Sequence, residues 1–204
     1  IIKEKAFTAK FALRLCYANS VGDDILLYKD VNRETCLGTI PTLRQQKKKV
    51  GKPAYYSLAD FIAPLNSDRL DACGAFICSI EKVDSFAKQF EEDKDDYTSI
   101  LVKALGDRMA EALTEYTHEC VRKNHWGYQS DENLSTEALI KEEYIGIRPA
   151  LGYPACPDHS NLELVWELLN GEKNTGATLT ENFAINPAST CLLYTSDAAD
   201  ESVC

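Results

Sequence analysis

Residues 72–80 read Ala-Cys-Gly-Ala-Phe-Ile-Cys-Ser-Ile, and the predicted fold depends on this stretch. It consists of small, apolar and β-branched side chains, a composition typical of a strand that is buried on both faces. Gly74 indicates a point where another group approaches the backbone closely. We interpret Cys73 and Cys78 as core residues because they lie within the apolar run. The stretch is therefore the expected centre of a sheet.

A helical region follows this strand, because residues 83–123 contain no proline and apolar side chains recur there every three or four positions. The acidic run at 91–96 indicates a break or a helix start. We therefore expect one helix over 83–91 and a longer one over 95–123. The recurring side chains are Tyr97, Ile100, Leu101, Ala104, Leu105, Met109, Ala112, Leu113, Tyr116 and Cys120.

Three short strands are expected before the central one, at residues 6–17, 25–28 and 31–40. A polar turn at 19–24 joins the first two into a hairpin. Early strands followed by helices predict an α+β fold with an antiparallel sheet.

The last third of the chain mixes element types. Ser135 is the expected N-cap of a short helix over 136–144. Ser160 and Glu163 have capping-box spacing for a further helix, which Gly171 would end. Residues 179–185 have the pattern of a strand.

Composition limits the classes of function. The 204 residues carry a net charge of −10, which argues against non-specific nucleic-acid binding and against anionic membrane surfaces. No apolar run reaches the roughly 18 residues that a membrane span needs. Because charged residues stand already at positions 3–5, we expect no signal peptide.

The eight cysteines are scattered, without a Cys-x-x-Cys pair or zinc-site spacing. This pattern predicts reduced thiols and a cytoplasmic location. His118, His125 and His159 also lack the spacing of a metal site, so no metal is expected.

A long irregular loop is predicted at residues 146–159, which contain three prolines and two glycines. Arg148 offers a planar fork that suits a carboxylate. Gly152 lets the backbone approach a ligand, and Tyr153 can lie against a planar ring. Such a loop is either a ligand-binding segment or a rigid surface turn, and composition leaves both open.

Asp107, Glu111 and Glu115 follow each other at intervals of four, which places them on one face of the long helix, and His118 lies near that face. Like charges at this spacing are tolerated when the face is fully solvated or turned toward a positive partner. Both interpretations stay open.

Several segments of this chain resemble one protein family. Residues 148–157, Arg-Pro-Ala-Leu-Gly-Tyr-Pro-Ala-Cys-Pro, resemble the S-adenosylmethionine-binding signature of the activation domain of cobalamin-dependent methionine synthase. Similar stretches occur in the family's order, and the resemblance covers roughly residues 5–189. They are residues 18–24, 43–46, 58–64 and 126–128.

The resemblance implies a binding site on the loop. Arg148 would pair with the methionyl carboxylate of the ligand, and Ala150 and Gly152 would supply backbone contacts. Tyr153 would lie near the transferred methyl group.

The resemblance also assigns two acidic contacts, Glu111 and Glu142. Carboxylates suit the ammonium and sulfonium groups of the ligand. More weakly, Asp107 would face a docking cobalamin domain. No side chain is expected to act as a catalytic acid, base or nucleophile.

The function implied is reactivation of methionine synthase, a 5-methyltetrahydrofolate–homocysteine S-methyltransferase. S-adenosylmethionine would donate a methyl group in the reductive methylation of cob(II)alamin to methylcobalamin. A partner domain of the same enzyme would hold the cobalamin, and a flavodoxin-type donor would supply an electron. The isolated domain is not expected to catalyse alone. The family's fold implies a twisted antiparallel sheet flanked by helices in a single curved domain.

The resemblance stops near residue 189, so we expect a binding domain over 1–189 and an unmatched tail over 190–204, of foreign or frame-shifted origin. Tyr194 is therefore not assigned a ligand contact. The family also has a segment before residue 1 with an acidic ligand contact. The alternatives are a stand-alone S-adenosylmethionine-binding module without catalysis and a protein that keeps the fold but binds no ligand.

Overall fold

The computed structural model describes residues 6–47 and 55–197. Its centre is a five-stranded sheet with the strand order β3-β2-β1-β4-β7, and every neighbouring pair is antiparallel. The α+β prediction is therefore confirmed. The strands are β1 (Thr8–Val21), β2 (Asp24–Tyr28), β3 (Cys36–Pro41), β4 (Asp71–Glu81) and β7 (Thr190–Thr195).

Strand β4 is the central strand that the sequence predicts. Its residues from Cys73 to Ile80 are buried, because helices cover both faces of the sheet at this point. Gly74 is required by close packing: a Cβ atom there would lie 2.8 Å from Leu15 Cδ2 and 2.9 Å from Thr195 Cγ2. Any side chain at this position would force the packed side chains of Leu15 and Thr195 to move.

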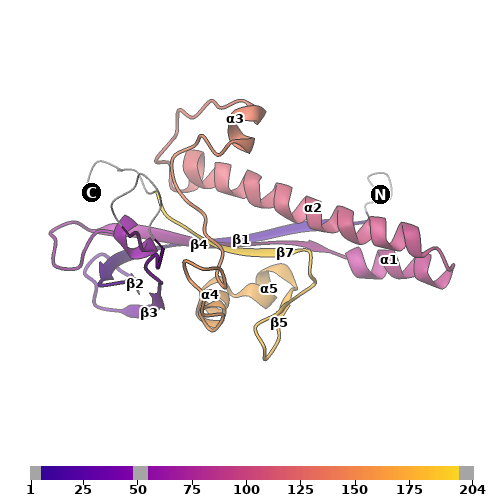
Figure 1. The fold of residues 1–204 in the computed structure, drawn as a ribbon, viewed down its shortest axis with the longest axis horizontal. Helices are drawn as coiled ribbons and strands as arrows, with labels where there is room; N and C mark the ends of the chain where they lie inside the picture. Colours follow the sequence, from indigo (N-terminus) through magenta and orange to yellow (C-terminus); the bar gives the residue numbers. More distant parts are fainter. Residues whose placement is uncertain (1–5, 48–54, 198–204) are drawn as a thin grey trace.

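Helices cover the two faces of the sheet (Figure 1). The long α2 (Asp96–Cys120) lies on one face, and α4 (Asn161–Leu169) and α5 (Gly171–Thr175) lie on the other. Helix α1 (Val83–Glu92) continues beyond the end of β4 and packs against α2. Gly106 lets α1 and α2 pack closely, since a Cβ there would lie 2.7 Å from the Val83 methyl carbons. Both predicted helices of this region are confirmed.

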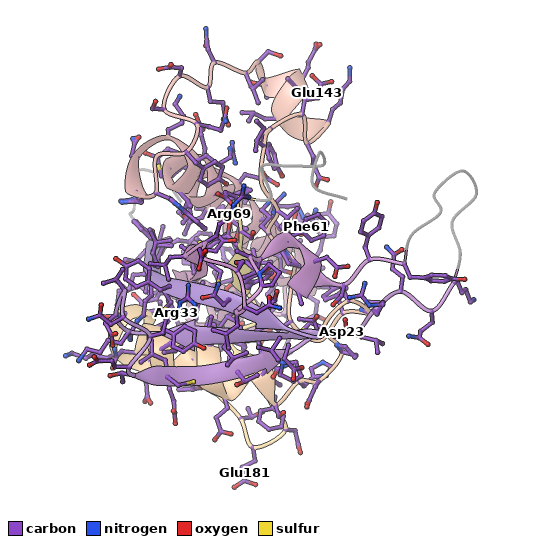
Figure 2. All side chains as sticks on the ribbon, turned by 90° about the vertical axis from the view of Figure 1, so that its left-hand side faces the viewer. Asp23, Arg33, Phe61, Arg69, Glu143 and Glu181 are labelled. Atoms are coloured by element: carbon purple, nitrogen blue, oxygen red, sulfur yellow. The ribbon has the colours of Figure 1, made fainter. Side chains whose placement is uncertain are left out.

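Smaller elements complete the described chain. They are a 3-10 turn (Leu58–Phe61), a π-helical turn (Val121–His125), α3 (Thr136–Ile140), β5 (Thr178–Leu179) and β6 (Ile185–Asn186). Figure 2 shows Glu143, just after α3, and Glu181, between β5 and β6, at opposite ends of the view. Among the described residues, no helix combines the length and the apolar character that crossing a membrane requires.

Three local predictions were wrong. The short helix ends at Ile140 rather than near residue 144. Ser160 provides no side-chain cap, because it has helical dihedral angles and the chain makes successive turns before α4. The expected strand at 179–185 is instead the two-stranded hairpin β5–β6, because Phe183 adopts a left-handed conformation (φ 59°) that turns the chain.

The expected domain boundary at residue 189 does not coincide with a break in the structure. Residues 190–195 form β7, which pairs with β4 in register from Ser79↔Thr190 to Gly74↔Thr195. Tyr194 is 1% exposed and belongs to the main core. Residues 190–195 therefore complete the sheet. Residues 198–204 of the expected tail lie outside the described residues.

Candidate functional site

The loop at 146–159 runs from α3 past strand β7 to α4 (Figure 1). Its first part is held by backbone hydrogen bonds to β7 and to Ser196, the residue after β7. Ile147 N–H donates to the Ser196 carbonyl oxygen (2.9 Å), and Tyr194 N–H donates to that of Pro149 (3.2 Å). Ala150 forms a single antiparallel bridge with Leu193. The irregular loop that the sequence predicts is thus fixed to the edge of the sheet.

The second part of the loop is a tight turn at Gly152. Its φ is +86°, and its N–H donates to the Cys156 carbonyl oxygen (2.9 Å). A Cβ at this position would lie 2.7 Å from His159 Nε2, so the turn needs glycine for both conformation and space. Tyr153 follows and is 66% exposed. The turn therefore presents an aromatic ring to the exterior.

Arg148 is the arginine of this loop, and its side chain is 19% exposed. Its Nε donates to the Tyr144 hydroxyl (3.1 Å), and its Nη2 pairs with the Glu115 carboxylate and lies 3.7 Å from Glu142 Oε1. Burial alone lowers the pKa of Arg148, but the Tyr144 hydrogen bond and the two carboxylates outweigh burial and raise it. The guanidinium is thus a permanently charged group at the edge of the loop.

Two glutamates on the acidic face of α2 form ion pairs with two different arginines. Glu115 pairs with Arg148, whereas Glu111 pairs with Arg108 on its own helix (2.7 Å). The sequence left open whether this face is solvated or turned toward a positive partner. For Glu115 the partner is Arg148. Glu111 and Arg148 share a neighbour, the thiol of Cys191 in β7. Burial raises the pKa of that thiol, the charge of Glu111 raises it further, and the charge of Arg148 lowers it.

The structure brings together part of the expected site. Arg148 and Glu142 are close, and Ala150, Gly152 and Tyr153 lie on the same loop. Glu142 lies outside α3, with φ +56°, and its side chain is 71% exposed. Which of these residues contact a ligand stays a prediction.

A group of polar and aromatic side chains contacts Arg148 through Tyr144, which is partly buried, whereas the side chains of the other three members are buried. The Tyr144 ring lies under the Arg122 guanidinium, whose Cζ is 4.1 Å from the ring centroid, and His118 meets the ring edge-on at 5.1 Å. Arg122 makes two bonds to the Glu132 carboxylate, Nε–Oε2 at 2.5 Å and Nη2–Oε1 at 2.7 Å. We call Arg122, Glu132, Tyr144 and His118 the buried cluster.

His118 is held neutral in this cluster. Burial, followed by the positive charges of Arg122 and Arg148, lowers its pKa to about 3. Its ring also stacks on Phe76, with centroids 6.4 Å apart. His118 is therefore an uncharged packing group and not a candidate acid or base at neutral pH.

Sequence reasoning missed most of this cluster. Tyr144 and Arg122 carry no motif, and Glu132 lies ten residues from its partner in a polar loop that looks solvated. Of its four members, the sequence singles out His118 alone, for its place near the acidic face of α2. Among the described residues, no group of three or more His, Cys, Asp or Glu side chains is arranged to hold a metal ion.

Comparison with known proteins places this fold. The sequence matches the family described as vitamin B12 dependent methionine synthase, activation domain, over residues 1–201, past the expected boundary at 189. The chain is also similar to a crystal structure of the MetH reactivation domain bound to AdoHcy, with 48% identity and a TM-score of 0.92. That similarity covers 97% of this chain and 61% of the other, so this chain spans about three-fifths of the other's length. By sequence and by fold, the chain belongs to the family of vitamin B12 dependent methionine synthase activation domains.

Proposed function

We propose that this chain binds S-adenosylmethionine and presents it as a methyl donor for reactivation of cobalamin-dependent methionine synthase. The observation that carries the proposal is the position of Arg148, a half-buried cation on a loop fixed to β7 and flanked by carboxylates. The similar MetH domain was solved with AdoHcy, the demethylated form of S-adenosylmethionine.

The loop residues fit the two halves of this ligand. The Arg148 guanidinium suits the methionyl carboxylate, because a planar fork and a carboxylate form paired hydrogen bonds. Ala150 and Gly152 would contact the ligand through backbone atoms. Because the Gly152 N–H already donates to the Cys156 carbonyl oxygen, Gly152 would use its own carbonyl oxygen for this contact. The exposed Tyr153 ring would lie beside the sulfonium methyl group.

The acidic residues fit the positive groups of the ligand. Glu142 lies beside Arg148 with its side chain largely exposed, and Glu111 forms an exposed ion pair with Arg108. Carboxylates at these positions would attract the ammonium and sulfonium groups, which are costly to place in a dry site without a partner. The role of the protein is placement of the methyl group, which requires no strong acid or base.

The wider reaction involves groups beyond this chain. A cobalamin-binding domain of the same enzyme would hold cob(II)alamin, which accepts the methyl group and one electron to give methylcobalamin. A flavodoxin-type protein would supply the electron, and the reaction would take place in the cytoplasm. The chain itself would supply the ligand site and a docking surface.

The proposal is tested by titration calorimetry of S-adenosylhomocysteine, an unreactive analogue, into the wild-type chain and the Arg148→Ala variant. Loss of a charged hydrogen-bond partner should weaken binding by at least about tenfold. Arg69→Ala is the matched control, since Arg69 is exposed in the segment before β4 and should leave affinity unchanged. The proposal fails if the wild-type chain gives no binding heat, or if Arg148→Ala binds as tightly as wild type. Heat that Arg148 controls, with no turnover when the partner domains are added, would favour the stand-alone binding module.

A further inference from the structure

We propose that Tyr144 is a positioning residue that fixes the orientation of the Arg148 guanidinium for the carboxylate of the ligand. The inference rests on the proposed function and adds a residue outside the loop signature. Tyr144 lies four residues before Arg148, in irregular chain between α3 and the loop.

Two side chains, Arg122 and His118, hold the Tyr144 ring. Arg122 Cζ lies 4.1 Å from the ring centroid, a distance at which the cation is attracted to the electron-rich face. His118 meets the ring at an interplanar angle of 87°, the edge-to-face geometry that aromatic pairs favour. The ring therefore has little freedom to turn.

The groups that hold Tyr144 are themselves fixed. The side chains of Arg122 and Glu132 are 1% and 5% exposed, and their two-bond contact fixes the plane of the Arg122 guanidinium. His118 is anchored on α2 and stacks on Phe76 of β4. The position of the Tyr144 hydroxyl is thus determined by the sheet, by α2 and by the loop that carries Glu132.

That hydroxyl accepts the hydrogen bond from Arg148 Nε at 3.1 Å. The Arg148 Nη2 is meanwhile directed to Glu115 on α2. Because a guanidinium is planar, contacts at Nε and Nη2 together fix its orientation as well as its position. A flexible arginine would have to lose side-chain entropy when it binds a carboxylate, and this arrangement removes that cost before binding.

The arrangement predicts a specific kind of coupling. Tyr144 acts only through the guanidinium, so its hydroxyl should matter when residue 148 is arginine and should matter little when residue 148 is lysine. Lysine retains the positive charge but has no Nε–H in a planar fork. A purely structural role for Tyr144 would weaken binding equally in both backgrounds.

The test is a double-mutant cycle of Tyr144→Phe and Arg148→Lys, with S-adenosylhomocysteine affinity measured by calorimetry. Phenylalanine keeps the ring between Arg122 and His118, so melting temperature should hardly change. Tyr144→Phe should weaken binding about five- to tenfold with Arg148 present, as expected for one charge-assisted hydrogen bond, and less than about twofold in the Arg148→Lys background. Tyr97→Phe is the control, because Tyr97 is 74% exposed near the start of α2.

The possible results separate this inference from the proposed function. Equal losses in the two backgrounds, or no loss in either, would overturn the positioning role while leaving Arg148 as the ligand's partner. A wild-type chain that does not bind S-adenosylhomocysteine would overturn both.

Discussion

Two arginine–glutamate pairs near α2 have the same chemistry in opposite surroundings. Arg108 and Glu111 pair at 2.7 Å with side chains 74% and 53% exposed, whereas Arg122 and Glu132 pair at 2.5 Å with side chains 1% and 5% exposed. The exposed pair is screened by water and contributes little to stability. The buried pair has lost its hydration, so each charge depends on the other.

The difference in burial distinguishes a glutamate that is available to bind a ligand from one that holds other side chains in place. Glu111 can leave Arg108 at small cost, which suits a residue proposed to bind a positive group of a ligand. Glu132 cannot leave Arg122, which suits a residue that holds Tyr144 and, through it, Arg148. The neighbouring glutamate of the acidic face, Glu115, is intermediate, because it pairs with the half-buried Arg148.

The largest effect is expected from breaking the buried pair. Glu132→Ala leaves the Arg122 charge without its partner in a dry site, which should cost about 3–5 kcal/mol of unfolding free energy. Urea denaturation followed by circular dichroism measures this loss. A cost below about 1 kcal/mol would show that the pair is no more important than an exposed one.

A second effect, of intermediate size, concerns His118 in the same cluster. Its pKa is lowered to about 3, so between pH 6.5 and pH 3 the unfolded chain binds a proton that the folded chain does not. Stability therefore falls as the pH falls through this window. Between pH 7 and pH 5 His118 should account for about 2 kcal/mol of that fall.

The check is His118→Phe, which keeps a ring between Phe76 and Tyr144 but removes the titrating group. Urea denaturation at pH 7 and pH 5 should show a smaller fall for the variant than for the wild-type chain. An identical fall in both proteins would mean that His118 does not carry this pH dependence.

The smallest effect is expected at the exposed pair. Arg108→Ala should change unfolding free energy by no more than about 0.5 kcal/mol, because surface ion pairs contribute little. The same denaturation assay measures it. A loss as large as that of Glu132→Ala would remove the distinction between the two pairs.

Local pattern was enough to predict most elements. The apolar run from Cys73 to Ile80 forms β4, and the region with recurring apolar residues forms α2, because strands and helices have different periods. The pattern did not identify the buried face of α2: Tyr97, Ile100 and Tyr116 are exposed, and the buried residues are Ser99, Val102, Gly106, Ala110, Thr114, Thr117 and His118. Pattern failed at short elements such as β5 and β6, where a single turn residue, Phe183, decides the pairing. It failed at β7 as well, because a strand six residues long is stabilised chiefly by the neighbour with which it pairs.

By itself, the sequence determined the α+β class, the loop at 146–159 and the candidacy of Arg148, since these depend on local periodicity, on proline and glycine content and on a ten-residue signature. Only the tertiary structure decided what holds Arg148. Tyr144, Arg122 and Glu132 come from separate segments, and their roles depend on the loss of water around them when the chain folds. Because the Arg122–Glu132 pair is buried, it holds the Tyr144 ring in place. The spacing of residues in the sequence does not indicate which arginine–glutamate pairs become buried.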